Sequence, residues 1–147
     1  MRFLLSEDVA ADVHQARSDG TTPLSASCHS GHLDIVRFLL SEDVAADVHQ
    51  AENTGATPLF ISCETGRLDV VRFLLSEDVA ADANRAKNDG CSPLFMASLE
   101  GHFSVVRALC ELGNADVNFT DRGNTAASLA LANGHRDIAR YLTGRMG

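Results

Sequence analysis

One stretch of eleven residues, RFLLSEDVAAD, occurs three times without a change, beginning at Arg2, Arg37 and Arg72. The chain therefore repeats itself at an offset of 35 residues. A period in this range is typical of one supersecondary unit that stacks on its own copies, because a single copy cannot bury its apolar face alone. We therefore expect a linear array of repeats whose function is carried by its surface.

Each unit begins with a tight turn and a short helix. Asp19-Gly20 supplies the positive φ of a turn, Thr22 is a suitable N-cap, and Pro23 suits the first helical position. The same order recurs at Thr57-Pro58 and Ser92-Pro93, and a glycine that can end the helix follows at Gly31, Gly66 and Gly101. The first helix of each unit is therefore expected to be short.

A second, amphipathic helix follows at once. Leu33, Val36 and Leu40 share one face of this helix. Asp34 and Arg37 lie three residues apart on the other face, and their spacing recurs at Asp69 with Arg72 and at Asp137 with Arg140. We expect these residues to form exposed ion pairs worth a few tenths of a kcal/mol.

Four segments carry a family resemblance: TTPLSASCHSGHLDIVRFLL, ATPLFISCETGRLDVVRFLL, CSPLFMASLEGHFSVVRALC and NTAASLALANGHRDIARYLT. They resemble the ankyrin repeat, which consists of a β-turn and two helices with the signature T-P-L-H-x-A. The resemblance implies an all-α ankyrin-repeat solenoid of helix-turn-helix repeats linked by β-hairpin fingers. It also implies that fingers and first helices form a concave face that binds other proteins.

The repeat boundaries divide the chain into four full repeats preceded by half a repeat. The predicted units are a truncated half repeat with its finger at 1–18 and repeats at 19–53, 54–88, 89–120 and 121–147. Met1 stands at the place of Val36, so the first helix of the leading unit is absent and its stub has no polar cap. We expect either a fragment of a longer array or an end that is covered, and self-association through this end is possible.

The chain departs from the family pattern at two places in the repeat. The family's histidine after Thr-Pro-Leu is replaced by Ser25, Phe60, Phe95 and Ser128, so we expect apolar packing in place of a polar network. The link after the second helix is two residues longer in the early copies and lacks the usual glycine. We therefore expect the second helix to continue past Ser41 and Ser76.

Composition excludes several classes of partner. The net charge is −8 and Lys87 is the only lysine, whereas nucleic-acid binding needs clustered basic residues. No apolar stretch reaches the roughly 18 residues that span a bilayer, and the first residues do not resemble a signal peptide. We expect an intracellular protein whose four cysteines are reduced, with Cys28, Cys63 and Cys110 in the core.

Because the copies are otherwise so alike, the positions at which they differ are candidates for partner binding. They gather at the fingers and on the first helices, which the resemblance places on the concave face. The predicted residues are Arg17, Ser18, His29, Ser30, Glu52, Asn53, Glu64, Thr65, Lys87, Asn88, Phe95, Leu99, Glu100, Asp121 and Arg122. The alternative is that exposed positions simply drift.

Two further surface features are predicted. Phe95 and Leu99 lie four residues apart and could form an apolar anchor, although Phe60 and Phe95 could instead fill space between repeats. Translation symmetry stacks Glu7-Asp8, Glu42-Asp43 and Glu77-Asp78 into an acidic ridge, which either steers basic partners or is simply solvated.

The sequence favours a binding module over an enzyme. It contains no phosphate-binding glycine loop, metal-spaced cluster or nucleophile elbow, so we expect no catalysis, no cofactor and no metal. The predicted function is binding of another protein, of unknown identity, on the concave face, with no nucleic acid and no membrane. The alternative is a structural spacer in a larger repeat protein. Similar ankyrin fingers can also be substrates of asparagine hydroxylases, and Asn118 would be the candidate here.

Overall fold

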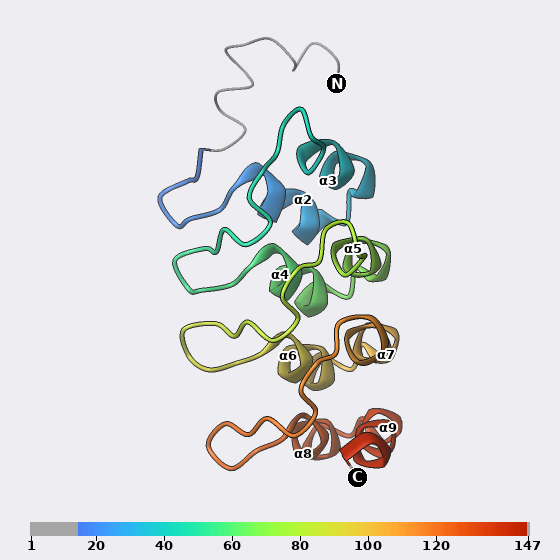
Figure 1. Cartoon of the computed structure of the whole chain (residues 1–147). Helices are drawn as coiled ribbons and strands as arrows, with labels where there is room; N and C mark the ends of the chain where they lie inside the picture. Colours follow the sequence, from blue (N-terminus) through green and yellow to red (C-terminus); the bar gives the residue numbers. More distant parts are fainter. Residues whose placement is uncertain (1–14, 147) are drawn as a thin grey trace.

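The computed structural model describes residues 15–146, which form four pairs of helices stacked in a line (Figure 1). The first helices of the pairs are α2 (Pro23–Ser30), α4 (Pro58–Thr65), α6 (Pro93–Glu100) and α8 (Ala126–Ala132). The second helices are α3 (Leu33–Leu39), α5 (Leu68–Leu74), α7 (Phe103–Leu112) and α9 (Arg136–Met146). Each kind of helix forms its own column, and the finger turns protrude beside the first helices (Figure 1). The solenoid prediction is confirmed.

The predicted turn and cap residues perform the expected roles. The Thr22 hydroxyl accepts a hydrogen bond from the Ser25 N–H at 3.1 Å, and Gly31 ends α2 with φ 78°. In return, the Ser25 hydroxyl accepts a hydrogen bond from the Thr22 N–H at 2.9 Å, and the two reciprocal bonds form a capping box. A helix that is only eight residues long is stabilised by such caps and by packing, because isolated short helices are marginal in water.

The core lies between the two columns of helices and is built from residues that the copies share. Leu24, Leu59 and Leu94 are at most 2% exposed, and so are the second-helix residues Leu74 and Leu109. Two of the positions where the family has histidine are also apolar and buried, since Phe60 is 1% and Phe95 4% exposed. The prediction that apolar packing replaces a polar network is confirmed at these two positions.

The prediction that the second helices continue past Ser41 and Ser76 is wrong. Helices α3 and α5 end at Leu39 and Leu74. The Ser41 and Ser76 hydroxyls each donate to the carbonyl oxygen three residues earlier at 2.7 Å, which terminates the helices, and the two additional residues are used in a turn. Ala45 and Ala80 complete this turn in the left-handed region, with φ 54° and 52°. Alanine thus occupies a conformation that favours glycine.

The predicted ion pairs of the second helices do not form. In residues 15–146 the salt bridges are Lys87–Asp89 at 3.7 Å and Arg107–Glu111 at 3.5 Å. The Arg37 guanidinium lies instead over the Phe73 ring of the following repeat, 4.8 Å from the ring centroid. Stacking on a half-buried ring competes well with an exposed ion pair, because such ion pairs contribute little.

The fingers are tight turns with very little β pairing. Across the described range, the single bridge is the antiparallel one between Asp121 and Asn124. No helix in this range combines the length and apolar character that a bilayer crossing requires. Of the predicted half repeat at 1–18, only residues 15–18 belong to the described range. The predicted free end and the acidic pair Glu7-Asp8 lie outside it.

Candidate functional site

The finger turns at 17–20, 52–55, 87–90 and 121–124, together with α2, α4, α6 and α8, form a surface that we call the finger face. Each of the first three fingers closes on itself through a backbone bond, such as the one from Lys87 N–H to Cys91 O at 2.9 Å. The Asp19 and Asp89 carboxylates accept the N–H groups of Thr21 and Cys91 at 2.9 and 3.0 Å. These hydrogen bonds hold the pKa of both carboxyls below the usual value.

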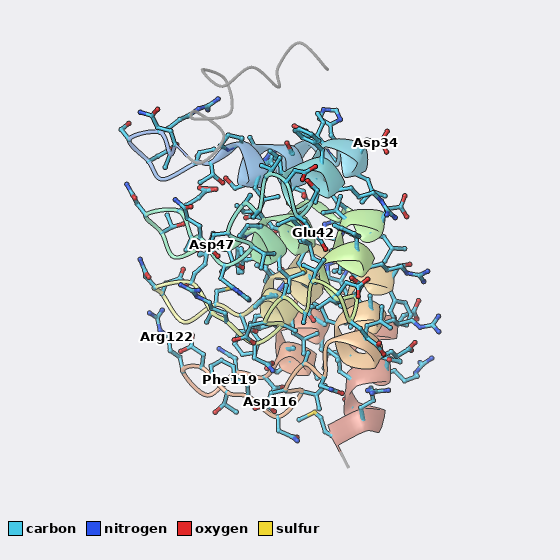
Figure 2. The ribbon with its side chains drawn as sticks, turned by 45° about the horizontal axis from the view of Figure 1, so that its top comes forward. Asp34, Glu42, Asp47, Asp116, Phe119 and Arg122 are labelled. Atoms are coloured by element: carbon cyan, nitrogen blue, oxygen red, sulfur yellow. The ribbon has the colours of Figure 1, made fainter. Side chains whose placement is uncertain are left out.

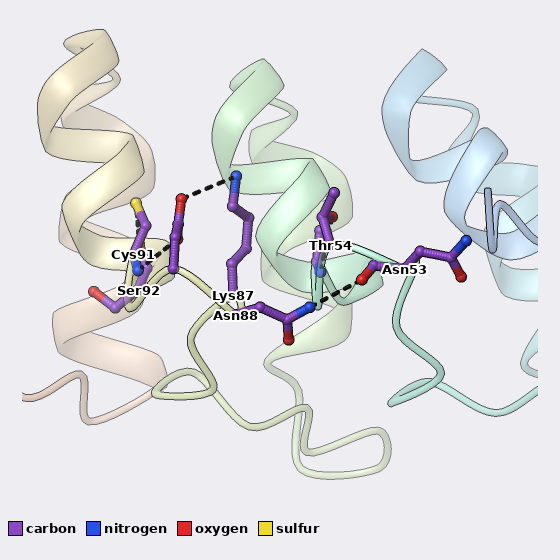
Figure 3. A network of polar contacts seen from close by, with 8 residues as sticks. Asn53, Thr54, Lys87, Asn88, Cys91 and Ser92 are labelled. Carbon is purple, nitrogen blue, oxygen red and sulfur yellow. Dashed lines mark hydrogen bonds and ion pairs between the residues drawn. The ribbon is translucent and has the colours of Figure 1, made fainter.

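Asparagine side chains tie neighbouring fingers together. The Asn53 amide donates to Ser18 O at 2.8 Å, and the Asn88 amide donates to Asn53 O at 2.9 Å (Figure 3). Backbone bonds from Asn53 N–H to Asp19 O and from Asn88 N–H to Thr54 O run beside them, at 3.0 and 2.9 Å. The first three fingers are therefore held in fixed register, and we call this set of contacts the asparagine ladder.

The ladder stops at the fourth finger, where an aspartate stands in the asparagine position. A Cβ added at Gly55 would lie 2.7 Å from Asn88 N, and a Cβ added at Gly90 would lie 3.0 Å from Asp121 Oδ1. Asp121 therefore corresponds to Asn88, and each of the two residues stands two places before the glycine of its own finger, Gly123 or Gly90. Its N–H donates within its own finger, to Asn124 O at 3.0 Å, and a carboxylate cannot donate to the third finger.

An apolar cluster lies at the centre of the finger face. Ala56, Phe60 and Ile61 are buried there, and the half-buried Cys91 and Met96 pack against them. The Lys87 ammonium lies 5.3 Å from the centroid of the Phe60 ring and 3.7 Å from Asp89 Oδ2, so this cation is already engaged (Figure 3).

Acidic side chains surround this cluster. Burial raises the pKa of Glu52, and the neighbouring Asp19 and Glu64 carboxylates raise it further. His29 and Lys87 act in the opposite direction, with smaller effect. The centre of the finger face thus combines apolar contact area with negative charge that repels itself.

The structure distributes the predicted site residues over three degrees of exposure. Eight are exposed: Arg17, Ser18, His29, Ser30, Asn53, Asn88, Glu100 and Arg122. Six are half-buried: Glu52, Glu64, Thr65, Lys87, Leu99 and Asp121. All fourteen belong to the finger face by their elements, but the amides of Asn53 and Asn88 are occupied by neighbouring fingers.

Phe95 does not fit the interpretation as an accessible anchor. Its side chain is 4% exposed, and its ring packs against Phe119, with the ring centroids 5.5 Å apart. It fills space between repeats, which was the alternative interpretation. Met96 and Leu129 are half-buried residues of α6 and α8 that sequence reasoning missed. The equivalent residues in α2 and α4 are Ala26 and Ile61. Because this position differs between all four copies, a comparison of the copies could have added it to the predicted binding residues.

The remaining histidines and cysteines have structural surroundings. His102 and His135 contact the carbonyl oxygens of Glu64 and Leu99 in the preceding repeats, each at 3.0 Å. All four cysteines are free. Burial raises the pKa of Cys28 and of Cys91 to about 11. Within the described residues no group of His, Cys, Asp or Glu side chains could hold a metal ion.

The acidic ridge is present only in part. Glu42, Asp43, Glu77 and Asp78 are exposed in the turns that follow α3 and α5, and Figure 2 labels Glu42. Glu7 and Asp8 lie outside the described residues. The structure tests no ligand for this ridge, so its role stays a prediction.

Comparison with known proteins identifies the repeat. The family model described as ankyrin repeats (3 copies) matches the chain twice, over residues 1–86 and 79–146. No curated protein matches the chain.

Proposed function

Because this chain belongs to the ankyrin-repeat family, whose members generally bind other proteins, we propose that it is a non-catalytic module that binds a partner protein at the finger face. No cofactor takes part. Four free thiols fit the intracellular setting that the sequence predicts.

The asparagine ladder is the observation that carries this proposal. It fixes three neighbouring fingers relative to one another before any partner arrives, through the Asn53 and Asn88 amides and the backbone bonds beside them. Ordering loops during association costs free energy, so a surface that is already ordered binds more tightly for the same contacts. The ladder thus provides a rigid base on which the side chains that differ between copies are displayed.

The side chains of the finger face also indicate the chemistry of the partner. Met96 offers half-buried apolar area at the apolar cluster, and the half-buried Leu99 occupies in α6 the place that Glu64 occupies in α4; the Glu64 carboxylate is in turn close enough to Glu52 to raise its pKa. A partner segment with an apolar residue flanked by Lys or Arg would bury the first and relieve the repulsion between the carboxylates. We therefore infer a basic partner surface, which also agrees with the net charge of −8.

The test compares two variants with the same change in net charge. One carries Arg17→Glu, Glu64→Lys and Glu100→Lys on the finger face, and the control carries Arg140→Glu, Asp69→Lys and Asp137→Lys on the second helices, away from that face and from the acidic ridge. Affinity capture with the unaltered chain, followed by quantitative mass spectrometry, defines the set of bound proteins. The finger-face variant is expected to lose these proteins, while the control variant retains them.

The spacer alternative makes a different prediction for the same experiment. A spacer without a ligand captures no protein that depends on the finger face, so both variants would behave like the unaltered chain. Equal losses in both variants would show that net charge, and not this surface, determines capture.

A further inference from the structure

One position of the second helices is aromatic in the first, second and fourth repeats and alanine in the third. Phe38, Phe73, Ala108 and Tyr141 occupy equivalent places in α3, α5, α7 and α9. Beside Ala108 lies an open hollow of about 290 Å³, lined by Arg72, Ser104, Arg107, Ala108, Glu111 and Leu112. We call it the Ala108 hollow. It lies where the repeat pattern would place a ring.

The residues around the hollow show what is missing. One repeat earlier, Arg37 stacks on the Phe73 ring at 4.8 Å. Arg72 is the equivalent arginine, but it faces an alanine position and makes no salt bridge within the described residues. Glu111 is already engaged by Arg107 at 3.5 Å and by the Tyr141 hydroxyl, which donates to it at 3.1 Å. The hollow therefore suits an aromatic ring accompanied by negative charge.

Helix α3 of the same chain displays such a group. Phe38 is 38% exposed, and the exposed Asp34 lies one helical turn before it. Glu42 follows in the exposed turn after the helix, and Figure 2 labels both acids. Phe38 and Leu112, which borders the hollow, are two of the four large hydrophobic side chains that are exposed in residues 15–146.

We propose that two copies of this chain associate through their second-helix columns, with Phe38 of each copy in the Ala108 hollow of the other. The stacking of the repeats makes this arrangement reciprocal. Phe38 and Ala108 each lie one repeat away from Phe73, so an antiparallel pairing about a two-fold axis at Phe73 forms both contacts together. In each contact Asp34 and Glu42 of one copy face Arg72 of the other, beside which Arg107 already neutralises Glu111.

A second hollow widens this surface. It measures about 470 Å³ and lies between α3 and α5, with Arg37, Arg72 and Phe73 in its lining. It adjoins the proposed axis, so the two copies would share a groove that runs from α3 to α7. The surface is opposite to the fingers (Figure 1), and the inference is independent of the proposed function.

The test is sedimentation equilibrium of the full chain over a wide range of concentration. The unaltered chain is expected to dimerise. Ala108→Phe places in α7 the residue that α5 already accommodates, so the variant should fold, gain a stacking partner for Arg72 and lose at least about tenfold in association constant. Asp34→Arg with Glu42→Arg should also weaken association, and adding Arg72→Glu should restore it in part.

Several outcomes would overturn the proposal. An unaltered chain that stays monomeric at all concentrations rules out the dimer, and assemblies larger than dimers rule out the two-fold arrangement. Association that is indifferent to Ala108→Phe would belong to another surface, such as the N-terminal end. A monomer that binds a different aromatic and acidic protein through the hollow would assign the site to that protein instead of a second copy.

Discussion

The asparagine ladder predicts that Asn88→Asp lowers the free energy of unfolding and that the reverse substitution in the next finger, Asp121→Asn, raises it. Asn88→Asp removes the donor that reaches Asn53 O at 2.9 Å and places a carboxylate against that carbonyl oxygen. A hydrogen bond of this kind contributes about 0.5–1.5 kcal/mol net. Since Asn88 is exposed and water can reach the freed carbonyl, we expect the free energy of unfolding to fall by about 1 kcal/mol, within that range.

Asp121→Asn is the reciprocal change in the fourth finger. Asp121 occupies the position of Asn88 relative to the preceding glycine, so an amide there can donate to Asn88 O and extend the ladder by one step. We expect a gain of about 0.5–1 kcal/mol. For a chain of this size, a change of 1 kcal/mol moves the melting temperature by about 2–4 °C.

Thermal unfolding followed by circular dichroism measures both changes, and amide exchange locates them. Exchange at the Asn88 N–H, which donates to Thr54 O, should accelerate in Asn88→Asp. Asn118→Asp makes the same chemical change at an exposed residue whose side chain binds no other finger, and Asp43→Asn is the matched control for Asp121→Asn.

The reasoning fails if Asn88→Asp melts at the temperature of Asn118→Asp. It also fails if Asp121→Asn melts below Asp43→Asn, because the added amide would then not find the carbonyl of the third finger. Opposite shifts of similar size would establish that the amide, and not the removal of a charge, connects the fingers.

Three further predictions concern stability. Ala80→Gly should raise the free energy of unfolding, measured by urea unfolding, by about 0.5–1 kcal/mol. The strain of a left-handed alanine, which glycine removes, is larger than the free energy lost to the added conformational entropy of the unfolded chain. Leu39→Ala should cost about 2–5 kcal/mol in the same assay, whereas Leu99→Ala should cost far less, since Leu39 is 4% exposed and Leu99 half-buried; equal losses would contradict the assignment of Leu99 to the finger face. Burial raises the pKa of Cys28 to about 11 in the folded chain and raises the pKa of Cys63 further, so unfolded thiols lose their protons first as the pH rises above about 9; the free energy of unfolding should therefore fall from about pH 9 to about pH 11, and Cys63→Ser should reduce that slope.

The parts of the fold that could be predicted from sequence are those in which one residue decides the backbone nearby. Thr22 and Gly31 mark the ends of α2 because a hydroxyl cap and a left-handed glycine act within one turn of the chain. The core could be predicted for a related reason, since identical apolar residues such as Leu59 and Leu94 have to be buried in every copy.

Contacts between repeats could not be predicted in this way. Asp34 and Arg37 have the spacing of an ion pair, but Arg37 finds a better partner in the Phe73 ring, which is distant in sequence. Asn53 and Asn88 are among the predicted partner-binding residues because the equivalent position in the first finger is Ser18, and positions that differ between copies are the candidates for binding. Their amides reach the preceding finger, a contact that becomes visible only when two repeats are stacked.

The ends of α3 and α5 differ from the prediction because a turn after a helix does not require glycine. The absence of glycine after Leu40 and Leu75 suggested that the helix continues. Alanine can adopt the left-handed region at a cost of about 1–2 kcal/mol, and Ala45 and Ala80 do so. The turn closes after Ala80 through a hydrogen bond from Ala81 N–H to Leu74 O at 2.9 Å.

The two proposed surfaces have a joint consequence because they lie on opposite sides of the solenoid. The fingers protrude beside the first helices, whereas Phe38 and the Ala108 hollow belong to the second-helix column (Figure 1). A dimer formed through that column leaves both finger faces free and directs them away from each other. A partner with one binding site should therefore bind the unaltered chain and Ala108→Phe equally well. A partner with two sites on a long linker should bind the dimer more tightly, since its second contact is intramolecular.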